Sequence, residues 1–110
     1  MDSRLLWGMV DMLILDVISR GPSYGYQIAQ TVMSQSKGYF ELKEGSLYPA
    51  LHRVERQKLL ASHWEETADS RRRKFYRLTP MGKQALEAKR DEWARFTEGV
   101  NGVLGQMLST

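Results

Sequence analysis

The sequence predicts a mostly α, α+β fold, a winged helix-turn-helix followed by a long C-terminal dimerisation helix. Two neighbouring segments predict it. Residues 45–56 have the spacing of a short helix whose buried side is formed by Leu47, Leu51 and Val54. Residues 60–66 and 72–78 alternate like two strands of a hairpin, and the second strand is strongly basic. A helix suited to a DNA groove beside a charged hairpin is the arrangement of a winged helix.

The chain of 110 residues fits one structural unit with a dimerising tail. We expect residues 1–79 to form the DNA-binding domain, with the first helix also contributing to a dimer, and residues 80–110 to form the dimerisation helix. Cysteine is absent, which excludes disulfides, thiol nucleophiles and cysteine-ligated zinc. No apolar run approaches the ~20 residues that span a bilayer, and no signal-peptide cleavage site is evident. The sequence therefore predicts a cytoplasmic protein, associated with the nucleoid when bound to DNA.

Positive charge is concentrated in the second half of the hairpin. The net charge is only +3, but residues 67–77 hold five basic residues against Asp69 alone. A local basic cluster favours a polyanionic partner more than total charge does. Arg71, Arg72, Arg73 and Lys74 are therefore candidates for phosphate or minor-groove contacts. The alternative is a solvated hairpin tip. Trp64 is expected to anchor the first strand.

Two helices are expected before the recognition segment. Residues 4–20 are apolar in nearly every direction, so one side of this helix needs a second chain or a ligand to cover it. Gly21-Pro22 ends it. Ser23 is the expected N-cap of a second helix over residues 24–35, and residues 39–43 form a connector, with one brief strand as an option.

The third helix is expected to begin with Ser46 as its N-cap, which would make Pro49 its third residue and leave it in the tolerant first turn. Its exposed N-terminal part supplies the other DNA-binding candidates: Lys43, Ser46, Tyr48, Pro49, His52 and Arg53. Packing of Tyr48 on the second helix is an equally good interpretation.

The last helix is expected over residues 80–107, since Thr79-Pro80 is a typical helix start. Its apolar residues recur at the spacing of a helix that packs along its length: Leu86, Trp93, Phe96, Val100, Val103 and Met107. Gly99, Gly102 and Gly105 either allow another backbone to approach or mark a frayed end.

Three motifs in order resemble the PadR family of transcriptional regulators. They are Pro22-x-Tyr24-Gly25-Tyr26-x-Ile28, then Gly45-Ser46-Leu47-Tyr48-Pro49-Ala50-Leu51 with Glu55, then Arg72-Arg73-Lys74-x-Tyr76-x-Leu78-Thr79-x-x-Gly82. The resemblance covers roughly residues 5–86. It implies a homodimeric repressor of the short type that binds a two-fold double-stranded DNA site in response to a ligand. The first helix of one subunit would pack on the last helix of the other. Gln57-Lys58 departs from the family pattern, in which a glycine commonly precedes the first wing strand.

The resemblance also suggests a site for a small aromatic effector, of phenolic or multidrug type, between those two helices. The candidates are Trp7, Val10, Trp93 and Phe96. Plain interface packing is the stronger alternative for such residues. No cofactor or metal is expected. The sequence shows no nucleophile beside an evident base, so it does not predict an enzyme. The rival function is a winged-helix module that binds proteins without specific DNA recognition.

Overall fold

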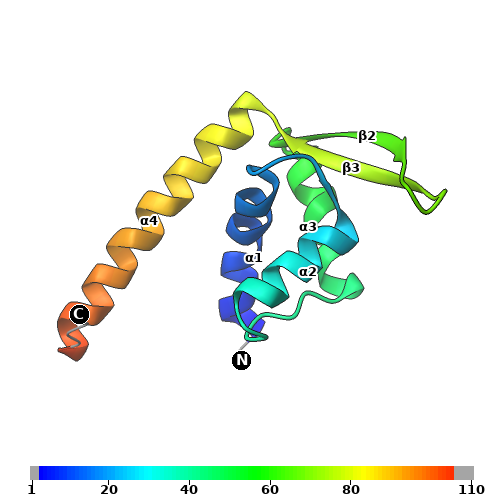
Figure 1. Cartoon of the computed structure of the whole chain (residues 1–110). Helices are drawn as coiled ribbons and strands as arrows, with labels where there is room; N and C mark the ends of the chain where they lie inside the picture. The colour runs from blue at the N-terminus through cyan, green and yellow to red at the C-terminus, as the bar shows by residue number, and fades with distance from the viewer. Residues whose placement is uncertain (1–2, 106–110) are drawn as a thin grey trace.

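The computed structural model describes residues 3–105, and their side chains from Met9 onward. Four helices and a small sheet form a winged helix with one protruding helix (Figure 1). The predicted fold class is confirmed. The elements in order are α1 (Ser3–Ile18), β1 (Ser23–Tyr24), α2 (Gly25–Gln35), α3 (Glu44–Arg56), β2 (Leu60–Glu66), β3 (Arg72–Leu78) and α4 (Pro80–Leu104).

Helix α1 lies at the centre of the domain, between α4 on one side and α2 and α3 on the other (Figure 1). Val10, Ile14 and Leu15 are completely buried there. The chain's own elements therefore cover the side of α1 on which the buried residues lie. The other side keeps the partly exposed apolar residues Met9, Met12 and Leu13, so the expectation that a second chain or a ligand covers one side of this helix stays a prediction.

The sheet is antiparallel with strand order β1-β3-β2. Both hairpin strands have the predicted bounds, and Leu60 pairs with Leu78 at the base of the wing. The optional strand at residues 39–43 does not form. The brief strand is instead Ser23–Tyr24, which pairs with Tyr76 and Phe75 of β3. A two-residue strand exists only through such a distant partner, so local sequence does not reveal it.

Two predicted helix caps are wrong. Tyr24, not Ser23, precedes α2, and its backbone N–H donates to the Gln27 side chain at 3.2 Å. Lys43, not Ser46, is the N-cap of α3, and its carbonyl accepts from the N–H groups of Ser46 and Leu47. Pro49 is therefore the sixth residue of α3, where its ring removes a helical hydrogen bond to the Gly45 carbonyl.

The turn between α3 and β2 contains the departure from the family pattern. Lys58 adopts a φ of +68°, the left-handed conformation that favours glycine. Its carbonyl accepts a hydrogen bond from the Thr79 hydroxyl at 2.8 Å, which ties this turn to the start of α4. A lysine thus occupies a left-handed position that glycine adopts more easily.

Helix α4 begins where Thr79-Pro80 predicts, but it ends at Leu104, short of the predicted residue 107. The Thr79 hydroxyl accepts from the Gly82 N–H at 3.0 Å. A Cβ on Gly82 would lie 2.1 Å from the Leu59 carbonyl oxygen, so only glycine fits. Gly105 ends the helix at a φ of +71°. Gly99 and Gly102 have open space around them, and Met107 lies outside the described residues.

Within residues 3–105, no helix combines the length and the apolar character that a membrane span requires.

Candidate nucleic-acid interface

One side of α3 is free of the protein core. Leu47, Leu51 and Val54 are buried on the other side, as predicted. The exposed row consists of Gly45, Tyr48, Pro49, His52 and Arg56, with Lys43 exposed at the N-cap and Ser46 half-buried. This is a helix face that a groove of DNA can accommodate.

Arg53 does not belong to this row. Its guanidinium pairs with Asp11 of α1 at 2.5 Å, on the side of α3 that faces the domain. Its proposed contact to a base is therefore withdrawn. Arg56 takes its place, because it lies one helical turn after His52 on the exposed side. The spacing of four residues between His52 and Arg56 was the sequence pattern that could have identified Arg56 as a DNA-binding candidate.

Tyr48 packs on the second helix, and its contact with DNA stays a prediction. Its ring packs on the first residue of α2, since a Cβ on Gly25 would lie 2.6 Å from the Tyr48 hydroxyl oxygen. The side chain nevertheless stays 45% exposed. The hydroxyl lies beside the N-terminus of α2, where backbone N–H groups lack helical partners and the partial charge is positive. This combination suits a phosphate oxygen.

Two of the four basic residues of the wing are already paired within the chain. Arg73 lies over the Tyr24 ring, 4.6 Å from its centroid, and bonds Asp69 at 3.1 Å. Hydrogen bonds from Thr67 and Arg73 lower the pKa of Asp69 to about 2. Lys74 pairs with Glu55 of α3 at 3.2 Å.

Glu55 joins the recognition helix to the wing. The Ser62 hydroxyl donates to Glu55 at 2.5 Å. This bond and the Lys74 ammonium hold the pKa of Glu55 below its usual value. Lys74 therefore has a structural partner, and its assignment to DNA phosphate is withdrawn. Among the described residues, Arg71 and Arg72 pair with no carboxylate and remain free for DNA.

Trp64 is a surface residue that sequence reasoning misplaced. Instead of anchoring β2 in the core, it is 57% exposed. The Arg72 guanidinium lies over its ring, 5.6 Å from the centroid. The register Trp64↔Lys74, derived from the strand bounds, was the available signal, because it places Trp64 beside basic residues on the wing.

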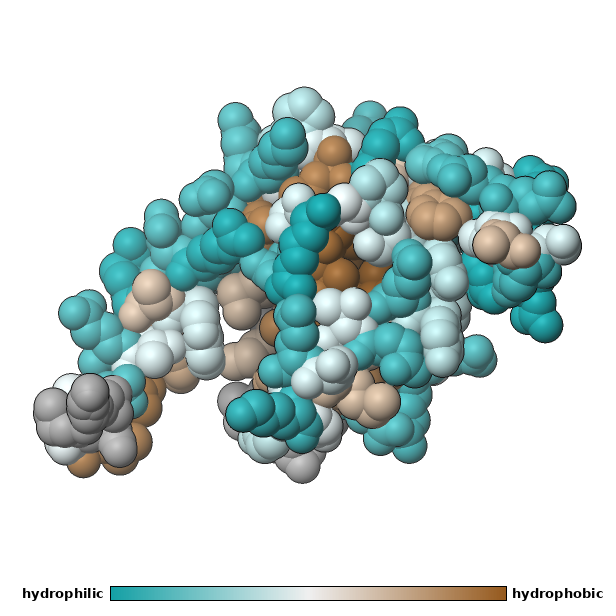
Figure 2. All heavy atoms as spheres, viewed as in Figure 1, coloured by the Kyte–Doolittle hydropathy of each residue, from teal (hydrophilic) through white to brown (hydrophobic). Residues whose placement is uncertain are grey.

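A cleft of about 350 Å³ joins the wing to the two helices of the helix-turn-helix. Its lining is aromatic and cationic: Tyr24, Gly25, Tyr48, Trp64, Arg72, Arg73, Lys74 and Tyr76. Most of the wing surface, at the right of the view in Figure 2, is hydrophilic. Tyr48 and Arg72 thus border the same hollow, which gives the recognition helix and the wing one continuous surface.

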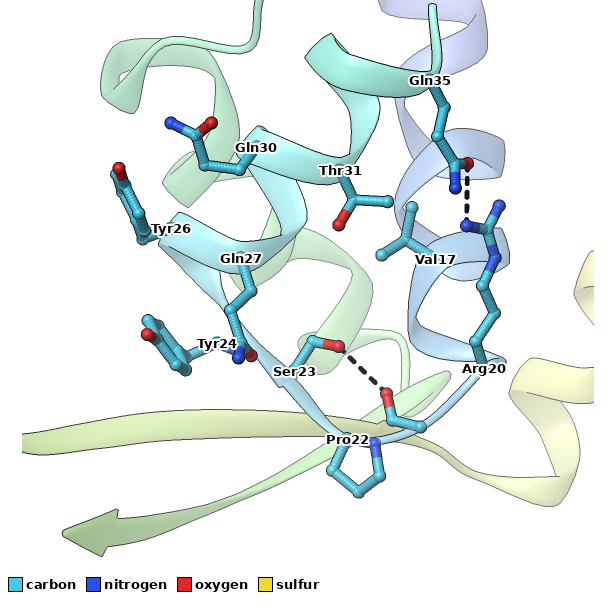
Figure 3. A pocket seen from close by; sticks show the side chains of 11 residues that line it. Val17, Arg20, Pro22, Ser23, Tyr24, Tyr26, Gln27, Gln30, Thr31 and Gln35 are labelled. Carbon is cyan, nitrogen blue, oxygen red and sulfur yellow. Dashed lines mark hydrogen bonds between the residues drawn. The ribbon is translucent and has the colours of Figure 1, made fainter. Parts of the chain in front are cut away.

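A second groove, of about 550 Å³, lies over the end of α1 and the side of α2 (Figure 3). Two hydrogen bonds join residues of its lining: Arg20 donates to Gln35 at 2.8 Å, and the Ser23 hydroxyl donates to the Gly21 carbonyl at 3.0 Å (Figure 3). Tyr26 and Gln30, which belong to the same lining, also line a hollow beside Tyr48 and Lys43. This groove therefore extends the recognition surface along α2.

The effector candidates do not all lie together. Trp93 and Phe96 stack on α4 with ring centroids 5.5 Å apart and are 39% and 59% exposed. Val10 is completely buried in the core of its own chain and is unavailable to a ligand, so it is withdrawn. Trp7 lies in α1, but its side chain is outside what the structure describes.

A family model for the "Transcriptional regulator PadR-like family" matches residues 14–88. The chain belongs to this family. The PadR-like match confirms the resemblance read from the three motifs. Members of the PadR-like family are transcriptional regulators rather than enzymes, which confirms the expectation of a non-catalytic protein.

Solved structures agree with the PadR-like assignment. A transcriptional regulator from Clostridium thermocellum is 31% identical with a TM-score of 0.82, covering 90% of this chain and 96% of that one. A PadR family transcription regulator from Clostridium difficile is 36% identical with a TM-score of 0.73, covering 89% and 99%. Among curated proteins, the transcriptional regulator YqjI of Escherichia coli is 31% identical over 85 residues, 77% of this chain but only 39% of that protein.

Proposed function

We propose that this PadR-like regulator binds a two-fold DNA operator as a homodimer and represses transcription until an effector releases it. It would act in the cytoplasm, at the nucleoid when bound. One observation carries the proposal: Tyr48, from the exposed row of α3, and Arg72, a wing arginine without a carboxylate partner among the described residues, border the same cleft. Such a surface supplies base contacts from the helix and phosphate contacts from the wing.

Dimerisation is assigned to residues 80–110. The apolar face of α4 continues beyond the domain core from Leu86, and Trp93, Phe96 and Val100 on it are at least 39% exposed. Exposed apolar side chains at this spacing favour a second helix as their cover. A homodimer would place two α3 helices about one turn of DNA apart, at ~34–36 Å.

The effector site is assigned to the stacked rings of Trp93 and Phe96. Flat aromatic surfaces between helices suit a phenolic or polycyclic ligand. A ligand that favours one arrangement of the two subunits would change the spacing of the α3 helices and release DNA.

The test is the salt dependence of binding, measured by fluorescence anisotropy with a duplex that the protein selects from a random-sequence library. We expect log affinity to fall steeply with log salt, because each phosphate contact contributes about −0.9 to the slope. Arg71→Ala should flatten the slope by about one contact. Arg95→Ala, an exposed position on α4, is the control and should leave the slope unchanged.

Failure to select any duplex at low salt would overturn the proposal. A salt-independent complex with another protein, together with no duplex binding, would favour the winged-helix interaction module instead.

A further inference from the structure

We propose that Trp64 is a positioning residue that holds the Arg72 guanidinium for insertion into the DNA minor groove, and that the wing thereby selects A·T pairs beside each half-site. This inference rests on the proposed DNA binding and adds a specificity determinant to it. Its components are an exposed ring, a cation stacked on that ring, and their place on the sheet.

The exposure of Trp64 has no explanation within the chain. A tryptophan buries more apolar surface than other side chains when it packs, yet 57% of this one faces solvent. The ring contacts a guanidinium instead of the core. An indole ring is the best partner for a cation over its face. The ring therefore limits the directions that the long Arg72 side chain can take.

The pair lies on the side of the wing that faces α3. Ser62 and Lys74 both bond Glu55 of α3, which identifies that face of the sheet. Trp64 pairs with Lys74 across the strands, and Arg72 lies two residues before Lys74 on the same strand, so all three side chains share the face. Trp64 and Arg72 extend it beyond the part that α3 covers, toward the hairpin tip.

The charge and the position of the Trp64–Arg72 pair favour a DNA groove as its binding partner. Trp64 and Arg72 line the same cleft as Tyr48 on the recognition helix. In the proposed complex, α3 occupies a major groove and this part of the wing reaches the adjacent minor groove. Arg73 and Lys74 have acidic partners, whereas Arg72 has none among the described residues, so its charge is available. Narrow A·T-rich minor grooves have enhanced negative potential and attract inserted arginine.

The experiment separates minor-groove from major-groove recognition by base substitution. The probe is the duplex selected by the wild-type protein, with the pairs beside each half-site made A·T, inosine·C or G·C. Inosine·C lacks the guanine N2 amino group that distinguishes G·C in the minor groove. We expect wild type to bind the A·T and inosine·C probes equally and the G·C probe about tenfold more weakly.

The variants assign this preference to the two side chains. Arg72→Ala should remove the preference, and Trp64→Leu should reduce it about threefold or more, with no additional loss in the double variant. Trp64→Phe should retain most of it, since it keeps an aromatic face. Arg72→Lys keeps the charge without a planar stack and should lose most of the discrimination. Arg71→Ala, the matched control, should weaken all three probes equally.

Either of two variant results would overturn the inference: a preference that persists in Arg72→Ala, or a Trp64→Leu protein with the same preference as wild type. Wild type binding all three probes equally would also overturn it while leaving the proposed function intact. If wild type selects no duplex, the proposed function fails together with it. Circular dichroism and thermal unfolding of each variant check that the exposed substitutions leave the fold unchanged.

Discussion

At the scale of single residues, Gly25 controls the position of Tyr48. The Tyr48 ring occupies the space that a Cβ on Gly25 would need, with the hydroxyl oxygen 2.6 Å and Cε1 2.8 Å from it. The obstacle is the tip of a side chain, not backbone, so a methyl group here moves the tyrosine and leaves the helices in place.

Gly25→Ala should therefore reduce DNA affinity without destabilising the fold. We expect a loss of about tenfold, comparable to a lost hydrogen bond to a charged group, because the hydroxyl leaves the α2 N-terminus. The unfolding free energy should change by less than about 1 kcal/mol, since alanine suits a helix better than glycine. Anisotropy titration and urea unfolding measure the two effects. In a Tyr48→Ala background the glycine substitution should cost nothing further; an additional loss would show that Gly25 acts independently of Tyr48.

Residue orientation was the least predictable part of the site. Helix periodicity identified the buried side of α3, but a start displaced to Glu44 and the partner Asp11 placed Arg53 toward α1 instead of toward DNA. An ion pair between residues 42 positions apart leaves no local pattern. The exposure of Trp64 had only an indirect signal, its register with Lys74, because composition favours burial of tryptophan and the tertiary position of the wing overrides it.

At the scale of elements, the wing and α4 were predictable because strong local signals define them. Alternation sets the bounds of β2 and β3, and Thr79-Pro80 starts α4. Contacts between elements could not be predicted from such local patterns. Asp16 of α1 forms ion pairs with Arg90 of α4 at 2.5 Å and with Arg20 at 2.7 Å. Arg20 also donates a hydrogen bond to Gln35 of α2. This chain of polar contacts connects the DNA-binding helices to the protruding helix.

Breaking the Asp16–Arg90 contact should loosen α4. It should also make the free energy of unfolding depend less on pH in the acid range. Burial alone would raise the pKa of Asp16, but the bonds from Arg90 and Arg20 outweigh it and lower the pKa below 3.8. A lowered folded-state pKa contributes stability above the unfolded value, which is lost as pH falls through the folded value. Arg90→Ala should cost about 1 kcal/mol or less at pH 7, because both side chains are partly exposed.

Urea unfolding of wild type and Arg90→Ala between pH 2 and 7 measures this difference, which should shrink below about pH 4. The exposed Lys83→Ala is the control and should not change the pH profile. A constant gap across the range would contradict the role of the Asp16 charge.

At the scale of the whole molecule, the single chain is elongated, 52 Å by 29 Å by 26 Å, because α4 extends away from the domain (Figure 1). The extension carries an apolar face that begins inside the core at Leu86 and continues through Trp93, Phe96 and Val100. A protruding helix with a continuous apolar face is stable when a second surface covers it.

Substituting Trp93→Ala and Phe96→Ala together should therefore abolish the dimer while leaving the winged-helix domain folded, since both rings lie outside its core. Sedimentation equilibrium should shift from two chains to one. Affinity for the complete two-fold site should fall at least a hundredfold, because two linked half-site contacts become independent. Affinity for a single half-site should stay the same. Arg95→Ala with Glu98→Ala, exposed on the opposite side of α4, is the charge-balanced control and should preserve the dimer. A double-alanine protein that remains dimeric would place the subunit contact elsewhere and leave the two stacked rings available solely for a ligand.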